Sequence, residues 1–330
     1  MYIVTGGAGF IGSVIIAELE KAFPQQRITV IDWLEEDDRW KNLNKRTLAD
    51  IIFPEDTLDY LEDHKDEIKA VIHMGAISTT TERNVNRIVE QNIGYTLDLF
   101  DWCAETDTPF IYASSAATYG QGEHGFNDSI DMKHLQKLAP LNAYGFSKHM
   151  IDKAIMQKTN KPSQWVGLKF FNVYGPNEYH KGGQKSVVAH AFKQIQETGK
   201  MKLFKSYHPD YEDGKQLRDF VSVKDIAQNI VWFIQNPTVS GIFNQGTGEA
   251  RSFKDLVAAT FKAMNLPENI EYIEMPDSLK DQYQYFTEAN MNNFNHVYKS
   301  IEGRDYTPTS LEDGVTDYVQ EHLLKADQYL

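Results

Sequence analysis

A glycine-rich turn near the start of the chain constrains the fold more than any other segment. It reads Gly6-Gly7-Ala8-Gly9-Phe10-Ile11-Gly12, follows an apolar run at residues 2–5 and opens a helical pattern, the context that a dinucleotide-binding turn requires. Glycines permit a tight turn and let backbone N–H groups approach a pyrophosphate at the positive end of the helix. Asp32 ends the second apolar run 20 residues after Gly12, where a carboxylate can accept hydrogen bonds from a ribose. Together these features predict a dinucleotide site.

Beyond this turn, short β-branched runs alternate with longer amphipathic segments, which is typical of βαβ units around a parallel sheet. Expected strands are 2–5, 27–32, 70–73, 110–114 and 166–174, and expected helices are 11–22, 57–68, 85–106 and 144–158. After Pro176 the loops lengthen, with helices expected at 187–199, 224–235, 253–264 and 311–324. The sequence predicts an α/β fold: a Rossmann-type doubly wound parallel sheet with a smaller mixed α/β C-terminal substrate lobe. We place an NAD(P)-binding domain at 1–176 and the substrate lobe at 177–330, with segments around 218–248 returning to the first domain.

Composition excludes several classes of partner. The 330 residues carry 33 Lys and Arg against 47 Asp and Glu, a net charge of −14, and such a surface repels nucleic acids and anionic membranes. No apolar segment approaches the roughly 20 residues that span a bilayer, and no signal peptide precedes the first strand. The lone Cys103 and ten scattered histidines give no disulfide and no metal-ligand spacing, so no metal is expected. We therefore expect a soluble cytoplasmic protein.

The segment after Asp32 leaves the choice between NAD and NADP open. A carboxylate at Asp32 disfavours the 2′-phosphate of NADP, as do the acids at 35–38, whereas Arg39 and the basic residues at 41, 45 and 46 could pair with it. Asp50 is a candidate adenine contact, with a turn or helix cap as the alternative. The stretch His73-Met74-Gly75-Ala76 ends a strand and predicts a backbone-lined floor under the cofactor.

Tyr144 and Lys148 are four residues apart and therefore share one helix face. The ordinary tyrosine pKa near 10 is too high for a base at neutral pH, and a nearby positive charge favours the phenolate. The same lysine could hold ribose hydroxyls. Ser115, at the end of an expected strand, could supply a hydroxyl to the same substrate oxygen. We predict that Ser115, Tyr144 and Lys148 are catalytic; the alternative is a surface pair and a strand-end serine cap.

With the glycine turn, these residues resemble the extended short-chain dehydrogenase/reductase family of nucleotide-sugar enzymes. Later segments that share the resemblance are Phe171-Asn172-Val173-Tyr174-Gly175-Pro176, Arg218-Asp219-Phe220-Val221 and Phe243-Asn244-Gln245-Gly246-Thr247-Gly248. Three more, Ser114-Ser115-Ala116-Ala117-Thr118-Tyr119-Gly120, His180-Lys181-Gly182 and Tyr283-Gln284-Tyr285-Phe286-Thr287, resemble the members that act on an ADP-heptose. The resemblance runs from Met1 nearly to the C-terminus. It implies inversion at C6 of the heptose of ADP-D-glycero-D-manno-heptose for lipopolysaccharide core assembly, through a transient ketone.

The resemblance also implies the site residues, a tightly bound NADP or NAD in each subunit, and a homo-oligomer. Tyr144 and Lys181 would be the two acid/bases, one on each side of the carbon, with phosphate pairing as the alternative role for Lys181. The implied cofactor-binding residues are Gly6, Gly9, Phe10, Ile11, Gly12, Asp32, Trp33, Arg39, Asp50, Met74, Gly75, Ala76, Ile77, Ser78, Gln91, Asn92, Tyr144, Lys148, Val173 and Lys181. The implied substrate-binding residues are Ser115, Asn172, Gly183, His190, Phe204, Lys205, Ser206, Arg218 and Tyr283. Arg218 is the bidentate candidate for the diphosphate of the ADP-sugar.

The sequence departs from the family pattern in three places, and two other functions stay open as alternatives. Residues 35–38 are more acidic than the family's usual segment after its second strand. Pro54 stands where the family often has a lysine for the cofactor phosphate, and the loop at 205–217 is longer than the family pattern. One alternative is a UDP-sugar 4-epimerase or a dehydratase, but Ala116 and Ala117 stand where dehydratases usually carry acids, which argues against elimination. The other is a non-catalytic dinucleotide-binding sensor. Sensors commonly lack the tyrosine or the lysine, and both are present here.

Overall fold

Apart from the exposed edge strand β3 (Asp50–Ile52), the strands of the main sheet are short runs that are almost entirely buried, as is typical of parallel sheets. The computed structural model describes residues 1–280 and 283–330. Seven parallel strands lie in the order β10-β6-β5-β4-β1-β2-β3. Their bounds are β1 (Tyr2–Thr5), β2 (Ile28–Ile31), β3 (Asp50–Ile52), β4 (Ala70–His73), β5 (Phe110–Ser115), β6 (Trp165–Phe170) and β10 (Gly241–Gln245). The predicted Rossmann-type doubly wound sheet is confirmed.

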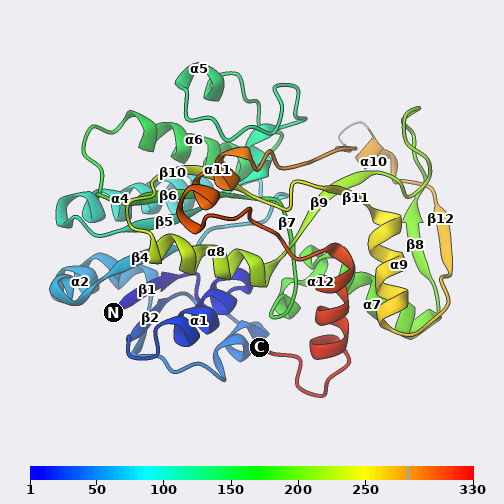
Figure 1. The fold of residues 1–330 in the computed structure, drawn as a ribbon, viewed down its shortest axis with the longest axis horizontal. Helices are drawn as coiled ribbons and strands as arrows, with labels where there is room; N and C mark the ends of the chain where they lie inside the picture. Colours follow the sequence, from blue (N-terminus) through cyan, green and yellow to red (C-terminus); the bar gives the residue numbers. More distant parts are fainter. Residues whose placement is uncertain (281–282) are drawn as a thin grey trace.

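Helices cover both faces of this sheet (Figure 1). On one face α1 (Phe10–Ala22) packs against α8 (Val223–Gln235), and on the other lie α4 (Tyr95–Thr106) and α6 (Ala143–Gln157). Neighbouring side chains of β1 point to opposite faces of the sheet. Val4 packs in the core beneath α1 and α8, whereas Ile3 packs in the core beneath α4 and α6. The remaining elements on this side of the molecule are η1 (Asp38–Leu43), η2 (Pro54–Asp56), α2 (Thr57–Asp63), η3 (Lys65–Glu67), α3 (Val85–Ile88), the π-helical η4 (Val89–Gly94), η5 (Ala116–Tyr119), α5 (Met132–Leu135) and α11 (Asn292–Glu302).

A second, smaller core lies at the other end of the molecule (Figure 1). Two small sheets contribute to it, ordered β11-β9-β7 and β12-β8. Their strands are β7 (Asn172–Tyr174), β8 (Met201–Phe204), β9 (Leu217–Ser222), β11 (Ala250–Ser252) and β12 (Ile270–Ile273). The helical elements there are η6 (Tyr179–Gln184), α7 (Val187–Thr198), α9 (Phe253–Ala263), α10 (Asp277–Lys280), α12 (Leu311–Asp317) and the π-helical η7 (Tyr318–Leu323). The predicted mixed lobe is therefore present.

The expectation of one strand at 166–174 is wrong. β6 pairs with β5 and β10 in the main sheet, whereas β7 pairs with β9 in a small sheet. Phe171 lies between them, and its N–H donates to the Gln245 carbonyl at 3.1 Å. An apolar run has the same sequence pattern whether it stays in one sheet or passes from one sheet to another. The sequence pattern therefore could not reveal the break at Phe171.

Residues far along the chain return to the main sheet. β10 pairs in parallel with β6, with Gly241 opposite Val166, and α8 covers the sheet beside α1. The expected helix at 85–106 is present as α3, η4 and α4 in succession. In the part of the chain that the structure describes, no helix is long and apolar enough to cross a bilayer.

Candidate active site

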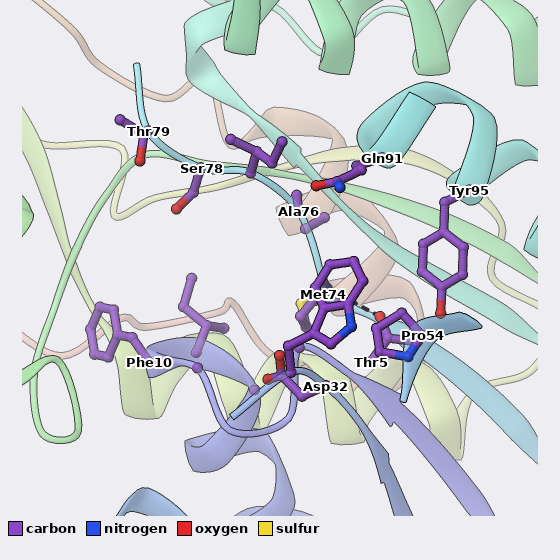
Figure 2. Close-up of a pocket in the computed structure, with 18 of the residues that line it drawn as sticks. Thr5, Phe10, Asp32, Pro54, Met74, Ala76, Ser78, Thr79, Gln91 and Tyr95 are labelled. Atoms are coloured by element: carbon purple, nitrogen blue, oxygen red, sulfur yellow. Dashed lines mark hydrogen bonds between the residues drawn. The ribbon is translucent and has the colours of Figure 1, made fainter. Parts of the chain in front are cut away.

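A cavity of about 860 Å³ lies at the carboxyl edge of the main sheet, where open α/β sheets bind ligands. Figure 2 shows side chains around it, with Phe10 on one side and Tyr95 on the other. Four segments supply most of its lining: the glycine turn, the end of β2, the loop after β4 and the start of α4. Predicted site residues on its wall are Gly6, Gly9, Phe10, Ile11, Gly12, Asp32, Trp33, Arg39, Met74, Gly75, Ala76, Ile77, Ser78, Gln91, Tyr144, Lys148 and Lys181.

The glycine turn lies against the loop after β4. Gly6 adopts a left-handed φ of 64°, and a Cβ there would lie 2.6 Å from the backbone nitrogen of Gly75. A Cβ at Gly12 would collide with the carbonyl oxygen of Gly6. α1 then begins at Phe10 without a side-chain cap on its first turn. Its free N–H groups at the cavity wall suit a pyrophosphate.

A buried hydrogen-bond chain supports the floor of the cavity. His73 bonds to Thr5 Oγ1 at 2.6 Å and to Thr96 Oγ1 at 2.8 Å, and Thr5 Oγ1 accepts from the Gly75 N–H at 3.1 Å. Burial lowers the pKa of His73 to about 3, with a smaller contribution from Lys148. His73 is therefore neutral and holds the loop after β4 in place.

Carboxylates gather at the end of β2. Asp32 accepts from the Ala8 N–H at 2.9 Å, and burial raises its pKa to about 6. Arg39 also lines the cavity, but Asp37 holds its guanidinium through Nη2 at 2.7 Å and Nε at 2.9 Å. Glu35 lies 4.0 Å from the same guanidinium. Arg39, the cation that lies beside these carboxylates, is thus already paired.

Tyr144 and Lys148 project into the cavity from successive turns of α6. Lys148 is only 1% exposed, and its Nζ has no hydrogen-bond partner among the residues that the structure describes. Burial lowers the pKa of Lys148 to about 8, against the opposing charge of Asp152. Burial raises the pKa of Tyr144, while a hydrogen bond with Ser115 lowers it. Burial, opposed by Ser115 rather than by Lys148, therefore sets the direction of the Tyr144 pKa shift.

Lys181 reaches the cavity from η6, far from α6 in the sequence. Its Nζ lies 5.2 Å from the centre of the Phe10 ring. Burial lowers the pKa of Lys181, and the buried carboxylate of Glu178 opposes that shift. His180, beside it, also lines the cavity and is neutral, because burial lowers its pKa to about 4. The phenol and one amine from α6 and a second amine from η6 therefore share one cavity.

Two predicted substrate pairs come together in the smaller lobe. The Arg218 guanidinium lies 5.5 Å from the centre of the Tyr283 ring, and burial lowers the pKa of Arg218. His190 Nε2 lies 3.3 Å from the Gly183 carbonyl oxygen, close behind Lys181 in the chain. These four residues are outside the cavity lining.

Other predicted residues lie elsewhere. Asp50 is exposed on the edge strand β3, outside the cavity lining, and accepts from the Ile51 N–H at 2.8 Å. A turn or helix cap, the alternative role for Asp50, is therefore wrong. Lys205 pairs with Glu274 at 2.6 Å on the surface. Asn92 lies behind the wall and bonds both backbone groups of Ile77. The rest, outside the cavity lining, are Ser115, Asn172, Val173, Phe204 and Ser206.

Sequence reasoning missed several wall residues. Glu90, Tyr95 and Asp98 lie within two turns of Gln91, so helical spacing from Gln91 was an available signal. His180 directly precedes Lys181 in the chain. Glu35, Asp37 and Pro54 are already expected from the sequence near the cofactor phosphate, although they are not among the predicted site residues. Others left no local signal: Thr5, Ile31, Glu55, Thr79, Glu82, Arg87, Ala113, Phe170 and Gln184.

The cavity fits a nicotinamide dinucleotide. The unpartnered, buried Nζ of Lys148 needs an acceptor such as a ribose hydroxyl. The uncapped start of α1 offers N–H groups to a diphosphate, and the Asp32 carboxylate can accept from an adenosine ribose. Among the described residues, no group of three or more histidines, cysteines or acids could hold a metal ion.

Comparisons with known proteins agree with this geometry. A model of the NAD dependent epimerase/dehydratase family matches residues 2–246. The ADP-L-glycero-D-manno-heptose-6-epimerase of Fusobacterium nucleatum is 48% identical over 338 aligned residues, covering 100% of both chains. The protein of that name from Nitratidesulfovibrio vulgaris is 46% identical over 333 residues, again covering 100% of both. The solved Helicobacter pylori ADP-L-glycero-D-manno-heptose-6-epimerase is 28% identical, with a TM-score of 0.78 over 97% of this chain and 95% of the other.

Proposed function

The chain belongs to the NAD dependent epimerase/dehydratase family, and from that premise we infer that it inverts C6 of the heptose in ADP-D-glycero-D-manno-heptose. The product is ADP-L-glycero-D-manno-heptose. Relatives aligned over their whole length at 46% and 48% identity carry the name of this epimerase. The observation that carries the inference is that Tyr144 and Lys181 line one cavity with the glycine turn.

The chemistry that a bound nicotinamide dinucleotide supplies is hydride removal from C6 and hydride return. Oxidation of the C6 alcohol to a ketone also releases the hydroxyl proton, which a base must accept. Reduction from the opposite face needs an acid on the other side of the carbon. We assign these two proton-transfer roles to Tyr144 Oη and Lys181 Nζ, because they come from separate elements.

Other residues prepare the two acid/bases. Ser115 lowers the pKa of Tyr144, and we assign its hydroxyl to the substrate oxygen. Lys148, with a pKa of about 8, is mainly charged at pH 7, so it favours a phenolate at Tyr144 once ligands fill the cavity. Arg218, stacked on Tyr283, is the cation we assign to the diphosphate of the ADP-sugar.

The cofactor we propose is NAD rather than NADP. Asp32, Glu35 and Asp37 place three carboxylates on the wall where the adenosine ribose would lie, and Arg39 is already paired with Asp37. A 2′-phosphate would meet those charges without a free cation. Identifying the nucleotide released on denaturation tests this assignment, and NADP in stoichiometric amount would contradict it.

The substrate is tested by NMR. Purified protein is incubated with ADP-D-glycero-D-manno-heptose, and the C6 configuration is followed over time. We expect conversion to a mixture of the two epimers without added reductant. Inversion of a UDP-hexose instead would support the UDP-sugar 4-epimerase alternative and overturn the assignment.

We further propose a homo-oligomer that acts in the cytoplasm. Phe146 on α6 is 40% exposed, and Val85 and Val89 on the neighbouring α3 and η4 are 45% and 43% exposed. Adjacent exposed apolar side chains support a contact between copies of the chain. Light scattering tests the oligomer, and a monomer at micromolar concentration would contradict it.

A further inference from the structure

A buried ion pair lies beneath the helix that carries Tyr144 and Lys148. Lys169 Nζ on β6 lies 2.6 Å from Asp152 Oδ2 on α6, and both side chains are 0% exposed. Asp152 also accepts from the Tyr112 hydroxyl at 3.0 Å and the Ser114 hydroxyl at 2.8 Å, both on β5. The carboxylate is therefore fully bonded, and it joins α6 to two strands.

The same lysine reaches the loop after Ser115. Lys169 Nζ donates to Thr118 Oγ1 at 2.7 Å, and the Thr118 hydroxyl donates to the Ser115 carbonyl at 2.8 Å. The Lys169 ammonium also lies 5.0 Å from the centre of the Tyr119 ring. A continuous polar chain thus runs from the backbone of Ser115 to Asp152 inside α6.

Asp152 follows Lys148 by one helical turn, and Lys148 follows Tyr144 by one turn. The three members of the catalytic group lie on two elements, because Ser115 ends β5 and the other two are on α6. A fixed distance between these elements keeps the Ser115 hydroxyl beside Tyr144, whose pKa it lowers. The polar chain spans that distance.

We propose that the Asp152–Lys169 pair is a positioning device that holds Ser115 in register with Tyr144 and Lys148. This inference rests on the proposed epimerase function. Stability alone is a poor explanation, since a buried ion pair is often no more stabilising than apolar side chains of equal volume. The geometry of the Asp152–Lys169 pair instead holds α6, β5 and β6 in one relative arrangement.

The pair also places one negative charge near Lys148. The titratable groups around Lys148 are Tyr144 and Asp152 on its own helix and His73 on β4, which is neutral. The Asp152 charge raises the pKa of Lys148 against the effect of burial. Removing the charge while keeping the fold should therefore lower the pKa of Lys148.

The test removes both charges together, because one alone would leave an unpaired charge in the core. In Asp152→Asn/Lys169→Met we expect a folded protein that binds its nucleotide, with kcat roughly 10- to 100-fold lower and KM little changed. Lys169→Arg keeps the charge and should restore most of kcat. A matched control is Lys224→Met/Asp317→Asn, which removes the 2.6 Å pair between α8 and α12, and its kcat should match the parent.

A second arm covers the case in which the double variant does not fold. Thr118→Val breaks the polar chain without changing any charge and should lower kcat, whereas Thr118→Ser should preserve it. Parental kcat in Thr118→Val would overturn the proposal. So would parental kcat and an unchanged pH profile in a folded double variant.

A readout without substrate separates this proposal from the proposed function. The pKa of Lys148, followed by NMR of carbon-labelled lysine, should fall in the double variant and not in the control. That shift can be seen even if the parent inverts no ADP-heptose. Conversely, an active parent with an unshifted Lys148 contradicts the proposal and leaves the epimerase assignment standing.

Discussion

The ammonium of Lys181 lies 5.2 Å from the centre of the Phe10 ring. Phe10 is the first residue of α1 and directly follows the glycine turn, so the proposed second acid/base lies against the element that would hold the dinucleotide. A cation over an aromatic face is stabilised by about 0.5 to 2 kcal/mol. The contact therefore orients an amine on a segment that has two exposed glycines, Gly182 and Gly183.

Replacing Lys181 with Met should remove one proton-transfer group while leaving the nucleotide in place. We expect epimerisation to slow roughly 10²- to 10⁴-fold, the usual contribution of a general acid/base. Inversion at C6 is measured by NMR, and bound nucleotide by absorbance after denaturation. Lys185→Met is the matched control, since Lys185 follows on the same segment outside the cavity. Equal rates for both variants would remove Lys181 from the mechanism.

Replacing Tyr144 with Phe should have an effect of similar size for the same reason. The variant retains the ring and loses only the hydroxyl, so the proton-transfer group disappears without creating a cavity. NMR of the epimer ratio checks it. A Tyr144→Phe variant as active as the parent would favour the non-catalytic sensor over an enzyme.

Glu178→Gln tests the electrostatics of Lys181. The Glu178 charge raises the pKa of Lys181 against burial, so its removal should lower that pKa. Lys181 is a base only when neutral, and the acid limb of the kcat profile should therefore move to lower pH. Ser186→Ala is the control, because it disrupts the Glu178 carboxylate's bonding at 2.6 Å without removing its charge. A profile that moves equally in both variants would contradict the electrostatic reading.

Asp37→Asn should relax the preference for NAD. Without its carboxylate partner, Arg39 becomes available to a 2′-phosphate, and we expect NADP affinity to rise about 10-fold, or about 1.4 kcal/mol. Asp38→Asn serves as the control, since Asp38 pairs with Lys41 at 2.9 Å outside the cavity. Calorimetric titration of both nucleotides measures the effect. No gain in NADP binding would show that Arg39 does not limit the choice.

Asp32 gives a prediction for stability in the nucleotide-free protein. Its folded pKa of about 6 is above the ordinary 3.8, so between these values the folded state binds more protons than the unfolded state. Stability should therefore fall as the pH rises from about 4 to 6, by at most about 3 kcal/mol from this residue. Urea unfolding of the parent and Asp32→Asn across this range should show the slope in the parent alone. Parallel curves would contradict the raised pKa.

The sequence predicted those parts of the site that depend on local spacing. The glycine turn and the Tyr144–Lys148 pair are both set within one turn and one helix, so their neighbours in sequence are their neighbours in space. Lys181 was assigned by family resemblance alone, and its contact with Phe10 joins residues far apart in the chain. The site assignments themselves stay predictions until the variants above are measured.

The fold was predicted where apolar runs were long and regular. The main parallel sheet follows from the βαβ alternation, but β7 and β11 have three residues each, too few for a pattern to emerge. The turn or cap considered for Asp50 was wrong because only tertiary pairing with β2 makes its segment a strand. Whether such a short segment forms a strand depends on the strand it pairs with rather than on its own β-propensity.

The break at Phe171 has a consequence for protein engineering. The chain leaves the main sheet there, returns to it after Ser222 at α8, and leaves again after β10 to form β11. The chain therefore crosses between the two cores three times within residues 170–250. A chimera that takes its sugar-binding end from a relative must be spliced at several points, and no single protease cut in this stretch can release one end from the other.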